Sequence, residues 1–259
     1  MTRYDNIILD FDGLLTNLEQ EAEHVVDIFY TTLAAQLGKS EELFAQEVKQ
    51  LKQEYAGTNT QWEMYGQPTA RWDADPYGQA TVLADTIYEA TNPKDPDKTR
   101  NLVKAFRSAQ AKAPTHLHPE AKSLVHVLEK EANLVVVTNS DPQQTREKLA
   151  TIDFSHDVIG NAKKYLVDPD YTQLPELHRH ARIRRPHFHT ILKQLEEQRG
   201  FTPKNTVLAG DIYEFDLALP QHLGYGTVLF SPHGQADKDI HAMNGRVASN
   251  YQELLTHLE

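Results

Sequence analysis

Asp10 and Asp12 are two carboxylates that stand where a short apolar run ends near the start of the chain. Ile7, Ile8 and Leu9 precede them without polar alternation, which is the pattern of a strand buried on both faces of a parallel sheet. Ligands of such sheets bind just beyond the carboxyl ends of the strands. Two carboxylates this close repel each other and are costly to desolvate, so they need a cation, a shared proton or solvent. The first of these options makes a binding site.

Two further apolar runs, at 134–137 and 206–209, are also followed by polar residues. These polar residues are Thr138, Asn139, Asp211, Glu214 and Asp216. Because the carboxyl ends of parallel strands share one edge of a sheet, we expect these groups to form one acidic pocket with the first two aspartates. Two unit charges about 4 Å apart repel by about 4 kcal/mol at an effective dielectric of about 20. Carboxylates at this density suit Mg²⁺, so the pocket predicts Mg²⁺ and a substrate that carries phosphate.

The rest of the chain supplies the elements that must hold this pocket. From Pro119 onward apolar strands alternate with helical segments, which predicts an α/β fold with a Rossmann-like, doubly wound parallel sheet. Residues 16–115 have helical spacing and no convincing strand. We therefore predict a core formed by residues 1–15 and 116–259, with residues 16–115 as an inserted α-helical cap. Within the cap, an aromatic segment at 62–77 is expected to be an irregular loop that either closes over a substrate or packs the cap together.

The composition of the chain limits the kinds of partner that we expect. The 259 residues include 37 acidic and 26 basic side chains, and the formal charge of −11 argues against a nucleic-acid or anionic membrane surface. No apolar stretch approaches the roughly 20 residues of a membrane span, and the first residues lack the apolar region of a signal peptide. We therefore expect a cytoplasmic protein that acts on a small molecule. The absence of cysteine excludes disulfides, a thiol nucleophile and a zinc–thiolate site.

Four motifs in a fixed order carry a resemblance to a known family. They are Asp-x-Asp-Gly from residue 10, Val-Val-Val-Thr-Asn-Ser from residue 135, Arg-Pro at residue 185 and Ala-Gly-Asp-x₄-Asp from residue 209. This series resembles the haloacid dehalogenase (HAD) superfamily, in the subclass with a helical C1-type cap, over residues 5 to about 230. The resemblance implies that Asp10 is a nucleophile that takes a phosphoryl group and that Asp12 protonates the leaving oxygen and then activates water. It also implies that Thr138 holds the phosphoryl oxygens, with Asn139 beside it.

The same resemblance implies a set of metal ligands. Mg²⁺ would contact the Asp10 carboxylate, the Asp12 backbone carbonyl and the Asp211 carboxylate. Asp216 or Glu214 would support it. Oxygen ligands of this kind suit a hard cation, and no paired histidine or cysteine favours zinc.

A positive charge should face the nucleophile and the phosphate. The lysine that precedes proline in the family is matched by Arg185 before Pro186, and a guanidinium can hold phosphate through two parallel hydrogen bonds. Lys164 is the competing candidate, and the proline context places Arg185 slightly ahead. Leu14 stands after Asp-Gly where the family usually has threonine, although Thr16 follows, so the turn is expected to differ.

A segment rich in histidine and arginine surrounds the Arg-Pro motif. Its members are His178, Arg179, His180, Arg182, Arg184, Arg185, His187 and His189. A solvated basic face is favoured over a metal or phosphate cluster, because no predicted helix places all four histidines on one side. His187 and His189 are close to Arg185 in the sequence, so an alternative is that these two histidines lie near the pocket.

The reaction favoured by these residues is Mg²⁺-dependent hydrolysis of a small phosphomonoester through an aspartyl-phosphate on Asp10. A phosphomutase of the β-phosphoglucomutase type uses the same four motifs and is an alternative. A non-catalytic binding or regulatory protein that keeps the HAD fold is a second one. Hydrolytic dehalogenation is disfavoured, because dehalogenases of this family lack an acid equivalent to Asp12.

Overall fold

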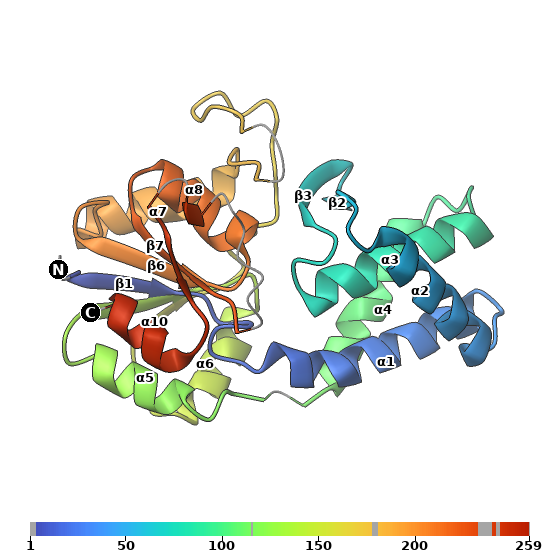
Figure 1. The fold of residues 1–259 in the computed structure, drawn as a ribbon, viewed down its shortest axis with the longest axis horizontal. Coiled ribbons are helices and arrows are strands. Elements are labelled where there is room, and N and C mark those ends of the chain that lie inside the picture. The colour runs from blue at the N-terminus through green and yellow to red at the C-terminus, as the bar shows by residue number, and fades with distance from the viewer. Residues whose placement is uncertain (1–3, 115, 178–180, 233–239, 242–243, 259) are drawn as a thin grey trace. The chain divides into compact units, whose positions relative to one another are not determined.

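The computed structural model describes residues 4–114, 116–177, 181–232, 240–241 and 244–258. Its main sheet has six strands in the order β5-β4-β1-β6-β7-β8, and every neighbouring pair is parallel (Figure 1). The strands are β1 Asn6–Leu9, β4 Asn133–Val137, β5 Asp157–Ile159, β6 Thr206–Gly210, β7 Gly226–Phe230 and β8 Arg246–Ala248. This is the predicted Rossmann-like, doubly wound sheet. Its order changes direction at β1, which is where such sheets bind ligands.

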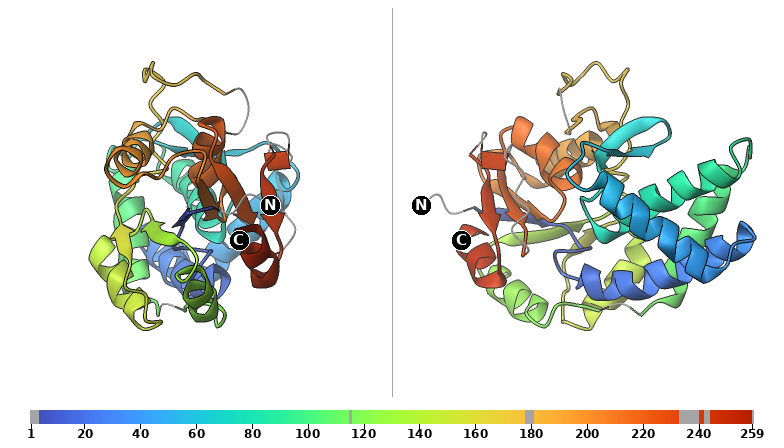
Figure 2. Two further views of the ribbon diagram at one scale, coloured as in Figure 1. Left: turned by 90° about the vertical axis from the view of Figure 1, so that its left-hand side faces the viewer. Right: turned by 45° about the vertical axis from the view of Figure 1, so that its right-hand side comes forward.

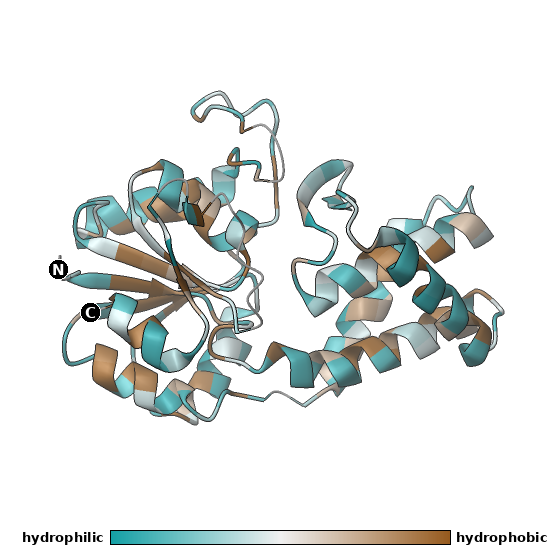
Figure 3. Cartoon of the chain, viewed as in Figure 1, coloured by the Kyte–Doolittle hydropathy of each residue, from teal (hydrophilic) through white to brown (hydrophobic). Residues whose placement is uncertain are grey.

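Helices cover both faces of this sheet (Figure 2). They are α5 Ala121–Leu128, α6 Pro142–Ala150, α7 Pro186–Arg199, α8 Ala218–His222 and α10 Tyr251–Leu258, and a π-helical turn Tyr213–Leu217 precedes α8. Ile7 and Leu9 pack in the layer that contains α5, α6 and α10, whereas Ile8 packs in the layer that contains α7 and α8. Alternate residues of β1 are thus buried on opposite faces, and the strands form an apolar centre between polar helix surfaces (Figure 3).

The chain divides into two compact units. One contains the residues up to Asn17, Met64–Ala70 and the residues from Leu117 onward, and the other contains Leu18–Glu63 and Arg71–His116. The boundaries that the sequence suggests, after residue 15 and before residue 116, remain a prediction. The short segment Met64–Ala70 belongs to the unit that contains the sheet rather than to the helices that flank it in sequence.

The second unit is built mainly from four helices. These are α1 Leu18–Gln36, α2 Glu41–Tyr55, α3 Pro76–Thr91 and α4 Lys98–Lys112. Phe29, Phe44 and Leu83 lie in its hydrophobic core with almost no exposure. Ser40 and Asp75 cap the N-termini of α2 and α3 by accepting hydrogen bonds from backbone N–H groups. This unit is therefore helical, as the apolar spacing predicts.

The expectation that residues 16–115 hold no strand is wrong. β2 Gln61–Met64 and β3 Gln67–Arg71 form a two-stranded hairpin. Tyr65 and Gly66 connect the strands, and both have positive φ, the geometry of tight two-residue hairpin turns. Tyrosine rarely adopts this conformation, so the turn carried little signal in the sequence. The short strand β8 was also not anticipated.

The hairpin replaces most of the irregular aromatic loop expected at 62–77. Trp72 is only 4% exposed and lies edge-on to Tyr55 in the core of the second unit. Tyr65 at the hairpin turn is 70% exposed instead. Trp72 thus packs in the core of its unit, which is the packing role that the sequence suggested as one of two alternatives for this segment. None of the helices in the described ranges combines the length and the apolar character that a membrane span requires.

Candidate active site

The turn after β1 carries the first two candidate residues. Asp10 lies directly after the strand, where its N–H donates to the carbonyl of Ala209 in β6 at 2.9 Å. Gly13 follows with φ +77°, and its N–H donates to Thr16 Oγ1 at 3.1 Å. Leu14 is fully buried. Leucine therefore fills the core at the position where the family has threonine, while the hydroxyl of Thr16 supplies the polar contact that closes the turn.

Asp12 is oriented by two hydroxyl groups from the end of β4. Thr138 Oγ1 donates to Asp12 Oδ2 at 3.2 Å, and Ser140 Oγ donates to the same oxygen at 2.6 Å. Thr138 Oγ1 in turn accepts a hydrogen bond from the Ser140 N–H at 3.0 Å. Ser140 was not among the predicted site residues. Ser140 is the last residue of the Val-Val-Val-Thr-Asn-Ser motif, two residues after Thr138, but its place in that motif does not by itself assign a partner.

Lys164 provides the ammonium group that contacts Asp10. Its Nζ lies 2.6 Å from Asp10 Oδ1 and 2.6 Å from Asp216 Oδ1, and the side chain is 2% exposed. Burial lowers the pKa of Lys164, but the charges of Asp10 and Asp216 outweigh this effect and hold the pKa above its ordinary value. The lysine therefore stays charged between the two carboxylates.

Arg185, the candidate that the sequence ranked ahead of Lys164, is placed differently. It forms the N-cap position of α7, before Pro186, and is fully buried. In the described structure its guanidinium donates to the backbone carbonyls of Arg182, Lys164 and Thr69 and not to Asp10. The contact expected of Arg185 is thus made by the other candidate, because the loop before α7 brings Lys164 to the end of β1.

The negative charge near Asp10 exceeds the positive charge that Lys164 supplies. Burial raises the pKa of Asp10 to about 8, and the charges of Asp216 and Asp12 add to the rise while Lys164 opposes it. The side chain of Asp10 is only 9% exposed, so solvent relieves little of this repulsion. A cation beside these carboxylates would lower the cost of ionising Asp10.

The carboxylates of Asp10, Asp211 and Asp216 gather closely enough to hold one metal ion. Each offers an oxygen, and these atoms all lie within 4.8 Å of one another. The chain makes room for them with glycine: a Cβ on Gly13 would lie 1.9 Å from Asp211 Oδ2, and one on Gly210 would lie 2.4 Å from Asp216 Cβ. Three carboxylate oxygens around a point of excess negative charge fit Mg²⁺.

The remaining predicted residues of this region lie nearby in other roles. The Asp12 carboxylate is not part of the three-carboxylate group, and the role of its backbone carbonyl as a metal ligand stays a prediction. Asn139 Oδ1 accepts a hydrogen bond from the Lys164 N–H at 2.7 Å, so it contacts the lysine backbone. Glu214 is buried in the π-helical turn.

The described part of the histidine- and arginine-rich segment forms local pairs. His178, Arg179 and His180 lie outside the described residues. Arg182 and Arg184 pair with Glu176 at 2.8 Å and 3.1 Å, and both arginines keep about a fifth of their side-chain exposure. His189 Nδ1 lies 2.7 Å from the hydroxyl of Tyr171. Within the described ranges this segment thus forms no metal cluster, although the burial of Arg185 departs from the expected solvated face.

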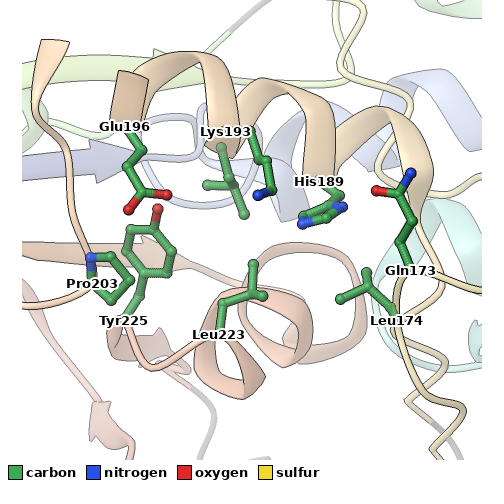
Figure 4. Close-up of a pocket in the computed structure, with 9 residues that line it drawn as sticks. Gln173, Leu174, His189, Lys193, Glu196, Pro203, Leu223 and Tyr225 are labelled. Carbon is green, nitrogen blue, oxygen red and sulfur yellow. The ribbon is translucent and has the colours of Figure 1, made fainter. Parts of the chain in front are cut away.

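A cavity of about 340 Å³ lies elsewhere on the sheet-bearing unit, beside α7 (Figure 4). Its polar lining includes His189, Lys193, Glu196 and Tyr225. None of the three clustered carboxylates lines it. It is therefore separate from the candidate active site.

The end of the parallel sheet thus presents a buried aspartate, an ammonium partner and a carboxylate cluster at the switch point of an α/β fold. The model of the haloacid dehalogenase-like hydrolase family matches residues 4–224. The chain therefore belongs to this family and is a HAD-like hydrolase. A comparison with curated protein sequences gave no match.

Several solved structures share the fold of this chain. YfnB of Bacillus subtilis, a proposed HAD-hydrolase bound to magnesium, matches with a TM-score of 0.61 and 15% identity over 99% of both chains. A predicted phosphoglycolate phosphatase from Haemophilus somnus matches with a TM-score of 0.60 and 16% identity over 100% of both chains. A proposed phosphatase from Clostridium difficile matches with a TM-score of 0.59 and 14% identity over 100% of both chains. At these identities the likeness establishes the fold alone.

Proposed function

We propose that this protein is a Mg²⁺-dependent phosphatase that hydrolyses a small phosphomonoester through an aspartyl-phosphate on Asp10. The observation that supports this most is the surroundings of Asp10. Its carboxylate lies 2.6 Å from the Lys164 ammonium and belongs to the cluster with Asp211 and Asp216. A buried nucleophile with a fixed positive partner suits attack on an anionic phosphate.

The reaction divides into two displacements at phosphorus. In the first, a carboxylate oxygen of Asp10 bonds to phosphorus while the bond to the leaving alcohol oxygen breaks, and Asp12 gives that oxygen a proton. In the second, a water oxygen bonds to phosphorus as the bond to Asp10 breaks, and Asp12 takes up a proton from the water. The products are the alcohol and inorganic phosphate.

The two oxygens of Asp12 suit this exchange of a proton. Oδ2 accepts the hydrogen bonds of Thr138 and Ser140, so Oδ1 is the oxygen that meets the leaving group and then the water. Lys164 balances the charge of Asp10 and of the incoming phosphoryl oxygens, and Asp10, Asp211 and Asp216 would hold Mg²⁺. Mg²⁺, when bound, neutralises phosphoryl and carboxylate oxygens so that an anionic substrate can approach.

The remaining parts of the proposal concern the cap and the substrate. Residues 16–115 form the inserted α-helical cap, and residues 1–15 and 116–259 form the catalytic core. The substrate is a small phosphorylated metabolite in the cytoplasm, and neither nucleic acid nor a membrane is a partner.

Release of phosphate from para-nitrophenyl phosphate, with Mg²⁺ or with a chelator, tests this function. We expect turnover that needs Mg²⁺ and is abolished by Asp10→Asn while the fold persists by circular dichroism. Asp27→Asn, an exposed aspartate of α1, is the control and should keep full turnover. Unchanged turnover in Asp10→Asn would remove Asp10 as nucleophile. Isomerisation of a sugar phosphate without release of phosphate would contradict hydrolysis and favour a phosphomutase.

A further inference from the structure

We propose that Arg185 is a positioning residue that holds the backbone of Lys164, so that the Lys164 ammonium points at Asp10. The inference rests on the proposed function, because it assigns a role to a residue outside the reacting groups. Arg185 is fully buried although it carries a guanidinium. Burying such a charge is costly, so its surroundings must satisfy it through well-placed acceptors.

Three backbone carbonyls from three segments accept hydrogen bonds from the Arg185 guanidinium. Nε donates to Arg182 O at 2.9 Å, Nη1 donates to Lys164 O, and Nη2 donates to Thr69 O at 2.6 Å. The guanidinium also lies over the ring of Phe215, with 5.4 Å from its carbon to the ring centroid. One planar group thus joins the segment that carries Lys164, the segment just before α7, and β3.

The backbone of Lys164 is held from both sides. Its N–H donates to Asn139 Oδ1 at 2.7 Å, and its carbonyl accepts from Arg185 Nη1. Asn139 follows β4 and Arg185 precedes α7, so both partners stand at the ends of regular elements. Lys164 itself lies in an irregular stretch, where no helix or strand ladder fixes it. These two hydrogen bonds therefore take the place of secondary structure.

The backbone just before Lys164 makes such support necessary. Asn161 and Lys163 have φ values of +51° and +48°, a conformation that is unfavourable for residues other than glycine. A lysine side chain also has a long flexible stem, so a small shift of its backbone moves the ammonium far from a target. Holding the carbonyl of Lys164 thus keeps Nζ within 2.6 Å of Asp10 and Asp216.

The guanidinium remains charged while it does this. Burial lowers the pKa of Arg185 to about 10, and the charges of Glu214 and Asp216 oppose the fall. At neutral pH the group is therefore protonated and keeps all its donors. Arg182 makes a second hydrogen bond to β3, because its Nη1 donates to Gln67 Oε1 at 2.8 Å.

The test compares Arg185→Lys and Arg185→Met with Arg184→Met. Lysine keeps the positive charge but has no fork that reaches three carbonyls, so a role of charge alone predicts that Arg185→Lys behaves as wild type. Arg184 is the matched control, because it also donates to backbone carbonyls of this loop, those of Leu174 and Pro169, but not to Lys164. If Arg185→Met fails to fold, the comparison can still be made with Arg185→Lys.

The first readout is labelling of Lys164 by acetic anhydride in the folded protein, followed by mass spectrometry. We expect Lys164 to be protected in wild type and in Arg184→Met and to react faster in Arg185→Lys. Protection that is unchanged in Arg185→Lys, with only a lower melting temperature, would overturn the proposal and leave Arg185 a purely stabilising residue.

The second readout is kinetic, with para-nitrophenyl phosphate and Mg²⁺. We expect Arg185→Lys to lower kcat roughly 10- to 100-fold while KM changes far less, because the displaced group acts in the reaction step. A change in KM alone, or no change in either parameter, would contradict the inference. If the wild-type protein lacks phosphatase activity, the labelling still decides the role of Arg185, so the two proposals fail separately.

Discussion

Ser140 and Asp12 are joined by a hydrogen bond in which Ser140 Oγ donates to Asp12 Oδ2 at 2.6 Å. Thr138 donates to the same oxygen at the longer distance of 3.2 Å. The two hydroxyls come from one short segment after β4, and they fix the rotation of a carboxyl group that follows β1. In the proposed reaction Asp12 transfers protons from a single position, so this orientation bears directly on the rate.

Ser140→Ala is expected to lower kcat about 10-fold with little change in KM, since it removes the shorter of the two hydrogen bonds that orient Asp12. Steady-state kinetics with para-nitrophenyl phosphate measures both parameters. Ser123→Ala is the matched control, because Ser123 is an exposed serine that donates to the carbonyl of Glu120 at the start of α5. A kcat equal to that of wild type would show that Thr138 alone orients Asp12.

Lys164→Met is expected to abolish detectable turnover and to destabilise the fold. It leaves Asp10 and Asp216 buried without their ammonium partner, a loss typically of about 3–5 kcal/mol for a broken buried pair. Urea unfolding measures the change in the free energy of unfolding. Lys163→Met, at the neighbouring half-buried lysine, should keep activity and most of the stability. Turnover that survives in Lys164→Met would refute the role given to Lys164.

Gly13→Ala is expected to disrupt the metal site in addition to straining the backbone. Alanine at φ +77° costs about 1–2 kcal/mol, and its Cβ would overlap the Asp211 carboxylate. Gly38→Ala is a close control, because Gly38 has φ +66° and nothing within 4 Å of an added Cβ. In a chelator Gly13→Ala should lose at least as much stability as Gly38→Ala, and only Gly13→Ala should need more Mg²⁺ for half-maximal turnover. An equal Mg²⁺ requirement would contradict the placement of Asp211.

The contribution of Asp10 to the stability of the metal-free protein should fall as pH rises from about 4 to about 8. Burial raises the pKa of Asp10 from 3.8 to about 8, so within this window the native state holds a proton that the unfolded state has released. The part of the free energy of unfolding that Asp10 contributes then decreases with pH and levels off above the raised pKa. Urea unfolding in a chelator at several pH values measures the slope.

Asp10→Asn removes this effect, and groups distant from Asp10 titrate equally in both proteins. As pH rises, the free energy of unfolding of wild type should fall relative to that of Asp10→Asn. A difference that stays constant from pH 4 to pH 8 would show that Asp10 ionises normally in the native state.

Much of the sheet and of the candidate site follows from short-range sequence patterns. The apolar run before Asp10 predicts β1, and the runs at 134–137 and 206–209 predict its two neighbours. Since parallel strands end at one edge, the order of the motifs is enough to place Asp10, Asp12 and Asp211 in one region. The hairpin of β2 and β3 escaped this reasoning, because its turn contains tyrosine at positive φ and its strands are short and polar.

The sequence by itself determined which carboxylates stand at the strand ends, because a residue next to a strand is placed by that strand. The tertiary structure alone decided which positive side chain faces Asp10. Lys164 lies outside the helices and strands and Arg185 directly precedes α7, and no local periodicity indicates which of them reaches the carboxylates. The folded chain assigns the contact to Lys164 and turns Arg185 toward the carbonyl of that same lysine.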